Sequence, residues 1–242
     1  MLSITERIAF LIIIGVFGTW TLLGFRVIFN LVRSGRAAPP LKNLVSSITK
    51  ALIDVGMQKT IFRSRPILSF FHAFIFFGFS YYLIVNGTDV LEGFVPGFEL
   101  IYNGELLAQT YPALQGLVDS GVINFYNLAA DILSVGVLVG MITFLVRRFI
   151  VGDKRQEFNK DVLLLDNVKK GSVFRDSLIV GIWMLTHIGA RFMGQILRLA
   201  REGKPDPYMP FASFIANAFS GASASGLELG IHISWWLAIG SV

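Results

Sequence analysis

The chain has only three histidines, and all three lie inside long apolar stretches. His72 lies in PILSFFHAFIFFGFSYYLIV, His187 in SLIVGIWMLTHIGARFMG and His232 in LELGIHISWWLAIG. An ionisable side chain within a membrane segment is costly, so it indicates a functional site by default. A b-type haem fits single imidazoles on separate membrane helices, because its iron takes neutral imidazole as an axial ligand. We therefore treat all three as candidate haem ligands, although each could instead hydrogen-bond to a neighbouring helix.

Two charged residues within the apolar stretches could support such a cofactor. Arg191 follows His187 by one helical turn and therefore shares its face. A buried arginine requires an anion, which a haem propionate would supply, and Asp131 in the third apolar stretch is the alternative partner. Asp131 is also a candidate for the quinone or proton site of a membrane electron carrier, alongside His232 and His72.

Two further arginines precede the stretch that carries His72. Arg63 and Arg65 lie close to its membrane entry and could hold the propionates of a haem on that side. They could equally be ordinary basic residues of a cytoplasmic loop.

The depths of the three histidines set a condition on any shared haem. An axial pair should lie at one depth, but a count of 1.5 Å per residue puts neighbouring depths about 7 Å apart. Helix tilt could absorb part of this difference. Three histidines also cannot complete two bis-histidine sites. The sequence therefore leaves open one haem with a spare histidine, or two haems with a fourth ligand in a continuation of the chain.

Membrane-spanning helices are the elements that must position these residues. Hydrophobic residues make up 54% of the chain, and its mean hydropathy is +0.65. Apolar runs of about 18 residues or more are typical of helices that span a membrane. The sequence predicts an all-α integral membrane domain of five transmembrane helices, at about residues 8–32, 66–85, 123–146, 177–196 and 229–242.

The fifth apolar run is short. It would span about 21 Å, against about 30 Å for the hydrocarbon core of a bilayer. We therefore expect residues 1–242 to form a single membrane domain of a longer polypeptide, whose missing part emerges into the cytoplasm.

Basic residues are sorted by loop, which predicts the topology. The first and third connections are basic, with Arg33, Arg36, Lys42, Lys50, Lys59, Arg63 and Arg65 in one and Arg147, Arg148, Lys154, Arg155, Lys160, Lys169, Lys170 and Arg175 in the other. The second connection is acidic, with Asp89, Glu92, Glu99, Glu105 and Asp119. The positive-inside rule then places the N-terminus outside and the C-terminus in the cytoplasm. The net charge of +5 follows this sorting, so we expect a lipid bilayer and no nucleic acid as partner.

Three half-apolar segments outside the predicted spans suit short interfacial helices. They are Leu41–Phe62, Glu99–Val118 and Ala212–Leu227. The chain contains no cysteine, so any iron–sulfur cluster would belong to a missing domain or a partner.

Several segments resemble one family of membrane proteins. They are RPILSFFHAFIFFGF, NLAADILSVGVLVG followed later by Arg147-Arg148, LTHIGARFMGQ and GIHISWWLAIG, on the second to fifth predicted helices. Together they are similar to the membrane domain of bacterial iron–sulfur oxidoreductases. In that family the membrane part is similar to the gamma subunit of respiratory nitrate reductase, and the soluble part to heterodisulfide reductase. The resemblance covers nearly the whole chain.

The resemblance implies a cytochrome b of the bacterial cytoplasmic membrane with one or two haems b. His72, His187 and His232 fall where the family's histidines are expected, but the nitrate reductase subunit has two histidines on its second helix and this chain has one. One branch of the family is an electron-transfer-flavoprotein:menaquinone oxidoreductase. The implied role is electron transfer between a cytoplasmic iron–sulfur or flavoprotein donor and menaquinone, with an iron–sulfur domain after the fifth helix. No side chain is expected to be catalytic in itself.

Two other functions fit the same residues. A haem-free membrane anchor would dock a soluble redox enzyme through the basic cytoplasmic loops. A small proton-coupled transporter would use Asp131, Arg191 and the histidines as a proton path. No internal repeat of the kind found in many transporters is evident, which argues against the transporter.

Overall fold

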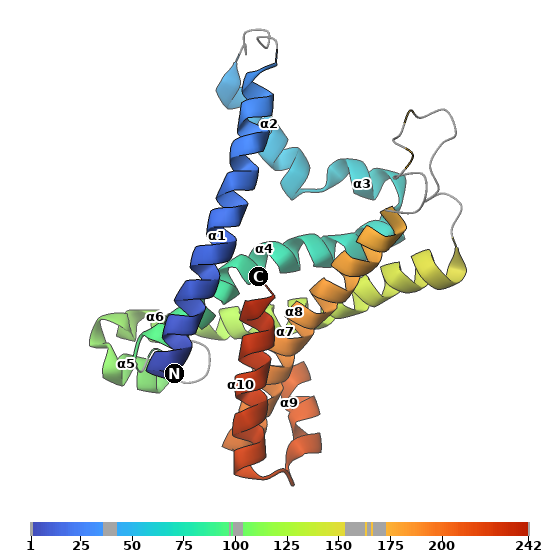
Figure 1. Cartoon of the computed structure of the whole chain (residues 1–242). Coiled ribbons are helices and arrows are strands. Elements are labelled where there is room, and N and C mark those ends of the chain that lie inside the picture. The colour runs from blue at the N-terminus through green and yellow to red at the C-terminus, as the bar shows by residue number, and fades with distance from the viewer. Residues whose placement is uncertain are drawn as a thin grey trace.

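The computed structural model describes residues 2–35, 43–96, 98, 104–152, 163, 166 and 173–241. These residues form helices, turns and loops, with no strand among them. Four helices are long and apolar enough to cross a membrane: α1 (Ile4–Arg33), α4 (Pro66–Phe94), α7 (Val122–Val146) with its π-helical continuation η2 (Arg147–Val151), and α8 (Val173–Glu202). This architecture agrees with the predicted class of all-α membrane protein (Figure 1).

The last helix, α10 (Ala224–Gly240), has 17 residues. It would span about 25 Å, less than a hydrocarbon core of about 30 Å. It begins five residues before the predicted start, because Ser223 caps its first turn by accepting a hydrogen bond from the backbone N–H of Gly226 at 3.2 Å. The fifth membrane span stays a prediction.

The first four predicted spans are shorter than the helices that contain them, most of all the second and the fourth. The second was expected to end near residue 85, but α4 continues to Phe94, and α8 extends beyond the predicted 177–196 at both ends. Asp89 and Glu92 therefore belong to α4, and their assignment to an acidic loop was wrong. A span predicted from hydropathy ends at such polar residues, but here both side chains are buried against other helices.

Close packing of α4 against α7 depends on small residues. A Cβ atom on Gly136 would lie 2.2 Å from Cδ1 of Phe74, and one on Gly78 would lie 2.2 Å from Cγ2 of Val137. Glycine lets two membrane helices approach where a larger side chain would separate them. The apolar core lies beside this contact, where α4, α7 and α8 meet α9 (Pro210–Ala216).

Hydrogen bonds fix the relative directions of α4, α8 and α10. Asn86, Asp89 and Glu92 of α4 pair with successively later residues of α8, so these two helices run in the same direction. Helix α10 runs back along α8 (Figure 1), because its early Glu228 bonds to the end of α8 and its late Ala238 bonds to the middle.

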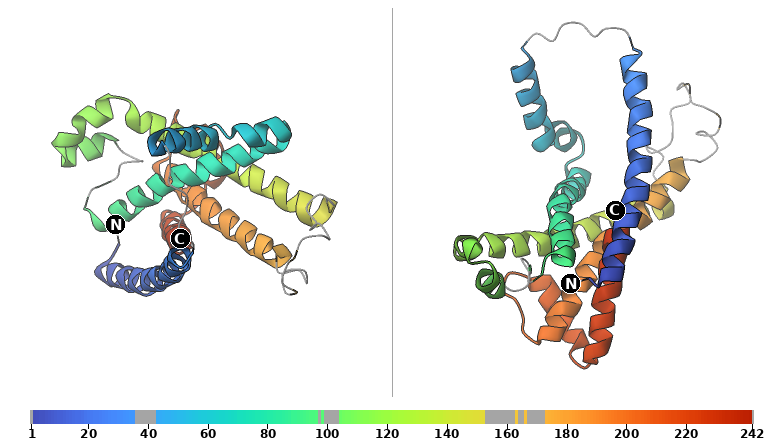
Figure 2. Two further views of the ribbon diagram at one scale, coloured as in Figure 1. Left: turned by 90° about the horizontal axis from the view of Figure 1, so that it is seen from above. Right: turned by 60° about the vertical axis from the view of Figure 1, so that its left-hand side comes forward.

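Helix α1 contacts the rest of the chain mainly through its N-terminal end. The backbone N–H of Leu2 donates to the carbonyl oxygen of Gly93 at 3.2 Å. Phe10 is buried, and the centroid of its ring lies 5.4 Å from that of Phe94 and 5.8 Å from that of Trp235. Beyond this contact α1 extends away from the other helices (Figure 2).

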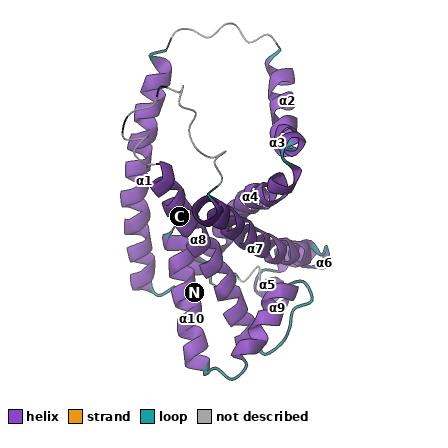
Figure 3. Ribbon diagram, turned by 90° about the vertical axis from the view of Figure 1, so that its right-hand side faces the viewer, coloured by secondary structure: helices purple, strands orange, loops and turns teal. Residues whose placement is uncertain are grey.

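The predicted interfacial segments form short helices. Leu41–Phe62 yields α2 (Leu44–Gly56) and α3 (Lys59–Ser64), which Figure 3 shows apart from α1, while residues 41 and 42 lie outside the described residues. Glu99–Val118 yields α5 (Gly104–Thr110), η1 (Pro112–Leu114) and α6 (Gln115–Asp119), with residues 99–103 outside the described residues. Ala212–Leu227 is not one helix: α9 and η5 (Asn217–Phe219) end before the turn that leads into α10.

Candidate functional site

His187 is buried at the centre of α8, with 3% of its surface exposed. Its Nδ1 lies 2.8 Å from the carbonyl oxygen of Ala238 and 3.0 Å from Oγ of Ser241, both at the end of α10. A carbonyl oxygen can only accept, so the partners assign the ring proton to Nδ1. Nε2 is then an acceptor and lies 3.4 Å from the amide nitrogen of Asn86 on α4. The imidazole is thus held with its Nε2 lone pair towards α4.

Aromatic rings enclose this imidazole on two sides. The indole of Trp183, one turn earlier on α8, stacks on it at 6.1 Å between centroids and 14° between planes. Tyr82 of α4 meets the ring edge-on at 5.9 Å, and its hydroxyl group bonds to Oγ of Ser134 at 2.6 Å. These contacts favour one orientation of the ring.

The other two histidines lie in more open surroundings. His72 is exposed on α4, and its Nδ1 lies 3.3 Å from Oε1 of Gln58, the buried residue between α2 and α3. The His232 side chain is 41% exposed on α10, and its Nδ1 lies 3.7 Å from Oε1 of Glu6 on α1. Each histidine therefore contacts a polar group from another part of the chain, and these parts differ among the three.

The structure does not bring the three histidines to one level. Asn86 marks the level of His187 on α4, and His72 lies fourteen residues earlier, about 21 Å along the helix. Ala238 marks the same level on α10, and His232 lies six residues earlier, about 9 Å away along that helix. The separation of His72 from His187 is much larger than the 7 Å expected from the sequence. Tilt alone does not close it.

These contacts test whether a haem fits the residues. A histidine that binds metal usually donates its other ring N–H to a carbonyl or carboxylate, as Nδ1 of His187 does. His187 thus has the form of a single axial ligand. The differing levels do not fit a bis-histidine pair drawn from the described part of the chain. Nor does any group of three or more His, Cys, Asp or Glu side chains gather there to hold a metal ion.

Arg191 pairs with Asp89 of α4, not with Asp131. Its Nε donates to Oδ2 of Asp89 at 2.7 Å, and its Nη1 donates to Oε1 of Gln195 at 3.3 Å. The side chains of Arg191 and Asp89 are 6% and 4% exposed. Of the two anions considered for Arg191, Asp131 was the wrong one, because α4 lies beside this face of α8 one turn beyond His187.

Asp131 has a structural role in the described contacts. Its carboxylate accepts hydrogen bonds from the backbone N–H groups of Phe211 at 2.8 Å and Ala212 at 3.0 Å, and the residue is fully buried. These N–H groups belong to the first turn of α9, where backbone donors lack partners within the helix. Asp131 therefore joins α7 to α9.

Arg63 and Arg65 lie at the opposite end of α4 from Asp89. Both are exposed, one in α3 and the other immediately before Pro66. They therefore lie near the same end of α4 as His72. No ion pair of either side chain is seen with another described residue.

Two further ion pairs continue from Arg191 towards the end of α8. Arg198 Nη1 lies 3.2 Å from Oε2 of Glu92 on α4, and Arg201 Nη1 lies 2.6 Å from Oε2 of Glu228 on α10. The side chains of the first pair are 18% and 6% exposed, and those of the second 38% and 52%. Together with the Arg191 pair they form a series, the charge ladder, that runs from the interior to the surface.

Sequence reasoning missed the charge ladder. One available signal was the spacing of Asp89 and Glu92, which puts both on one face of a helix. The other was the spacing of Arg191, Arg198 and Arg201, which also share a helix face.

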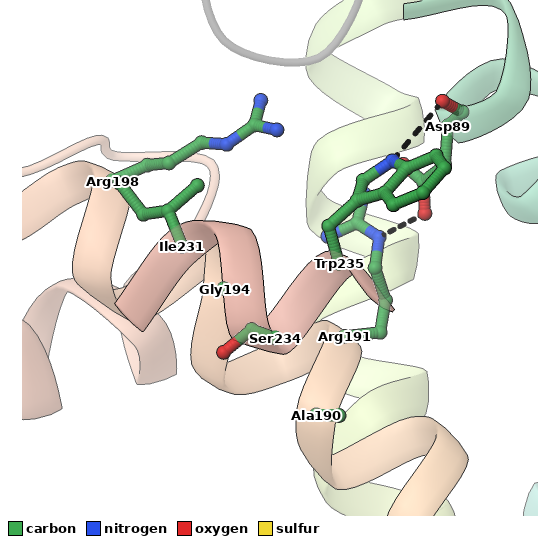
Figure 4. Close-up of a pocket in the computed structure, with 8 residues that line it drawn as sticks. All are labelled: Asp89, Ala190, Arg191, Gly194, Arg198, Ile231, Ser234 and Trp235. Atoms are coloured by element: carbon green, nitrogen blue, oxygen red, sulfur yellow. Dashed lines mark hydrogen bonds and ion pairs between the residues drawn. The ribbon is translucent and has the colours of Figure 1, made fainter. Parts of the chain in front are cut away.

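A small cavity lies beside the inner part of the charge ladder, between α4, α8 and α10. Its lining residues are Asp89, Ala190, Arg191, Gly194, Arg198, Ile231, Ser234 and Trp235 (Figure 4). Figure 4 shows Arg198 on the opposite side of this space from the Asp89–Arg191 pair. The indole N–H of Trp235 donates to the backbone carbonyl of Asp89 at 3.3 Å and so connects α10 to α4.

No family model, no curated protein and no solved structure matches the chain. The function proposed for the site therefore follows from the contacts of its own residues.

Proposed function

We propose that this chain is the haem b-containing membrane domain of a quinone oxidoreductase, with His187 as a haem ligand. The observation that supports this best is the state of the His187 imidazole. Its Nδ1–H is held by the Ala238 carbonyl, its Nε2 lone pair is directed away from α10, and the ring is buried. A buried neutral imidazole with one fixed proton is the form that coordinates haem iron.

In this proposal the chain's own residues orient the ligand and enclose it. The carbonyl of Ala238 and the hydroxyl of Ser241 fix the rotation of the His187 ring. The rings of Trp183 and Tyr82 flank the imidazole on two sides. A bound haem b supplies one-electron redox chemistry, whose potential depends on the axial ligands and on nearby charge.

A polar atom at the level of His187, the side-chain oxygen of Asn86, could bind a ligand. Asn86 faces Nε2 with its amide nitrogen, and its buried Oδ1 has no hydrogen-bond partner in the described part of the chain. A buried amide oxygen is rarely left without a partner. We propose that His187 is an axial ligand of the haem, and that His72 is not the second ligand of that haem, because His72 lies about 21 Å along α4 from this level.

The proposed setting is the bacterial cytoplasmic membrane. The positive-inside rule assigns basic helix ends to the cytoplasm. Such residues lie at the start of α4, with Arg63 and Arg65, and at the end of α7, with Arg147 and Arg148. The N-terminus would then face outside. Electrons would pass between a cytoplasmic iron–sulfur or flavoprotein donor, such as an electron-transfer flavoprotein, and menaquinone.

A reduced-minus-oxidised absorbance spectrum of the purified chain tests the proposal. The parent protein should show a b-type alpha band, and His187→Ala should lose it. His232→Ala is the matched control, since its side chain is 41% exposed, and it should keep the band. A parent protein without the band after expression with added haem would refute the proposal, as would an unchanged band in His187→Ala.

One observation favours a second candidate, a haem-free anchor for a soluble redox enzyme. All three histidines have protein partners, and no two of them share a level. An anchor would dock its enzyme through the basic connections, so it would co-purify with a soluble redox protein without any haem absorbance. The spectrum described above distinguishes the two candidates.

A further inference from the structure

The cavity beside the charge ladder has room for water but not for an organic ring. About 20 Å³ is open to the centre of a water molecule, and a single buried water needs roughly 10–15 Å³ by the same measure. A buried water also needs two to four polar partners. The cavity supplies such groups in Asp89, Arg198 and the buried Ser234.

Glu92 is linked to this cavity through Arg198, which lines it, and one oxygen of the Glu92 carboxylate has no partner among the described residues. The residue is 7% exposed, and its Oε2 bonds to Arg198. Its Oε1 is buried and has no hydrogen-bond partner in the described part of the chain. A buried carboxylate oxygen without a donor carries a large desolvation cost, which a water molecule or a proton on that oxygen would relieve.

The spacing of the ladder places its carboxylates at successive levels along α4 and α8. Asp89 and Glu92 are three residues apart on α4, so their Cβ atoms lie about 5–6 Å apart on one face. Arg198 and Arg201 are likewise three residues apart on α8, which places Glu228 about one turn nearer the surface than Glu92. The charged groups that act on Glu92 are Arg198 and Arg191 of α8 and Asp89 of its own helix.

We propose that Glu92 is a proton-exchanging group that connects the surface at Glu228 with the water-sized cavity beside Asp89. A hydronium ion at the surface gives a proton to the Glu228 carboxylate and leaves as water. The proton moves on to the Glu92 carboxylate, which becomes a carboxylic acid while Glu228 becomes a carboxylate again. The Glu92 acid then gives the proton to water in the cavity and returns to its carboxylate form. The arginines keep their charge throughout, and while Glu92 holds the proton Arg198 faces a neutral carboxylic acid. This inference does not depend on the haem proposal, because none of these residues contacts His187 through a described hydrogen bond.

Infrared difference spectroscopy of the full chain in lipid nanodiscs tests this role. The parent protein should show the C=O band of a protonated carboxyl group that titrates with pH and shifts within seconds of transfer to D₂O. Glu92→Gln should lose that band. Asp119→Asn, at an exposed acid away from the ladder, is the control and should retain it.

Three results would overturn the proposal: no such band in the parent, an unchanged band in Glu92→Gln, or a band that shifts in D₂O only after unfolding. If Glu92→Gln does not fold, Glu92→Gln combined with Arg198→Gln removes both charges and should also lose the band. The haem spectrum of these variants should match the parent, so failure here is distinguishable from failure of the haem proposal.

Discussion

Arg191 of α8 and Asp89 of α4 form an ion pair, with 2.7 Å between Nε and Oδ2 and almost no exposure of either side chain. The pair lies one helical turn beyond His187 and Asn86, which meet at 3.4 Å. It therefore sets the register of α8 against α4 at the level of the proposed haem ligand.

Removing one partner of this pair should destabilise the chain strongly. Arg191→Leu leaves the Asp89 carboxylate buried without its cation, and breaking a buried pair in this way costs about 3–5 kcal/mol. Unfolding in mixed detergent micelles would measure the loss. The double variant Asp89→Leu/Arg191→Leu should recover much of it, because no buried charge is left alone.

The control for that experiment is the pair of Arg175 and Asp176, whose side chains are 73% and 60% exposed. Arg175→Leu should change the free energy of unfolding by less than about 1 kcal/mol, since exposed ion pairs contribute little. Equal effects of Arg191→Leu and Arg175→Leu would contradict the described register of α4 and α8.

Gly136→Ala should weaken the contact of α7 with α4. The added methyl group would lie 2.2 Å from Cδ1 of Phe74, so the ring or the helix must move. Overpacking of this kind costs about 1–3 kcal/mol. The same unfolding assay would measure the cost, and Phe74→Leu in the Gly136→Ala background should recover part of it.

Gly15→Ala is the matched control, because nothing lies within 4 Å of the position that its methyl group would take on α1. Alanine is favoured over glycine in a helix by about 1 kcal/mol, so this change should be neutral or stabilising. A destabilised Gly15→Ala together with an unaffected Gly136→Ala would mean that the described helix contacts are wrong.

Asp131→Ala should loosen α9 without affecting any redox property. The backbone N–H groups of Phe211 and Ala212 would lose their shared acceptor, at a cost of about 1–3 kcal/mol for each buried donor left without a partner. Hydrogen–deuterium exchange of the α9 amides should rise. Asp131→Asn keeps one carbonyl acceptor and should have the smaller effect. A direct role of Asp131 in proton or quinone chemistry would instead give normal exchange and altered activity.

The sequence predicted the helical membrane class, because long apolar runs determine it. It did not distinguish the buried His187 from the exposed His72, since both lie in such runs. It did not predict which polar side chains meet. Asp131 and Arg191 seemed natural partners as the acid and the base at depth, but the crossing of α4, α8 and α9 gives each a different partner. Hydropathy placed Asp89 in a loop because it treats every charged residue as exposed. It does not show that Asp89 meets Arg191 on a neighbouring helix.

The histidines illustrate the same limit. Counting residues from the ends of apolar runs put His72 and His187 about 7 Å apart in depth. The Asn86 contact puts them about 21 Å apart along α4, because hydropathy does not show which level of one helix meets which level of its neighbour.

The most direct test of the central claim is rescue of His187→Gly by free imidazole. The variant retains the carbonyl of Ala238 and the hydroxyl of Ser241, which would hold an added imidazole as they hold the native ring. The b-type alpha band should be lost in His187→Gly and should return as imidazole is added, whereas addition of 1-methylimidazole, which lacks a ring N–H, should restore less of it. A band that is present in His187→Gly before any addition would contradict ligation of the haem by His187.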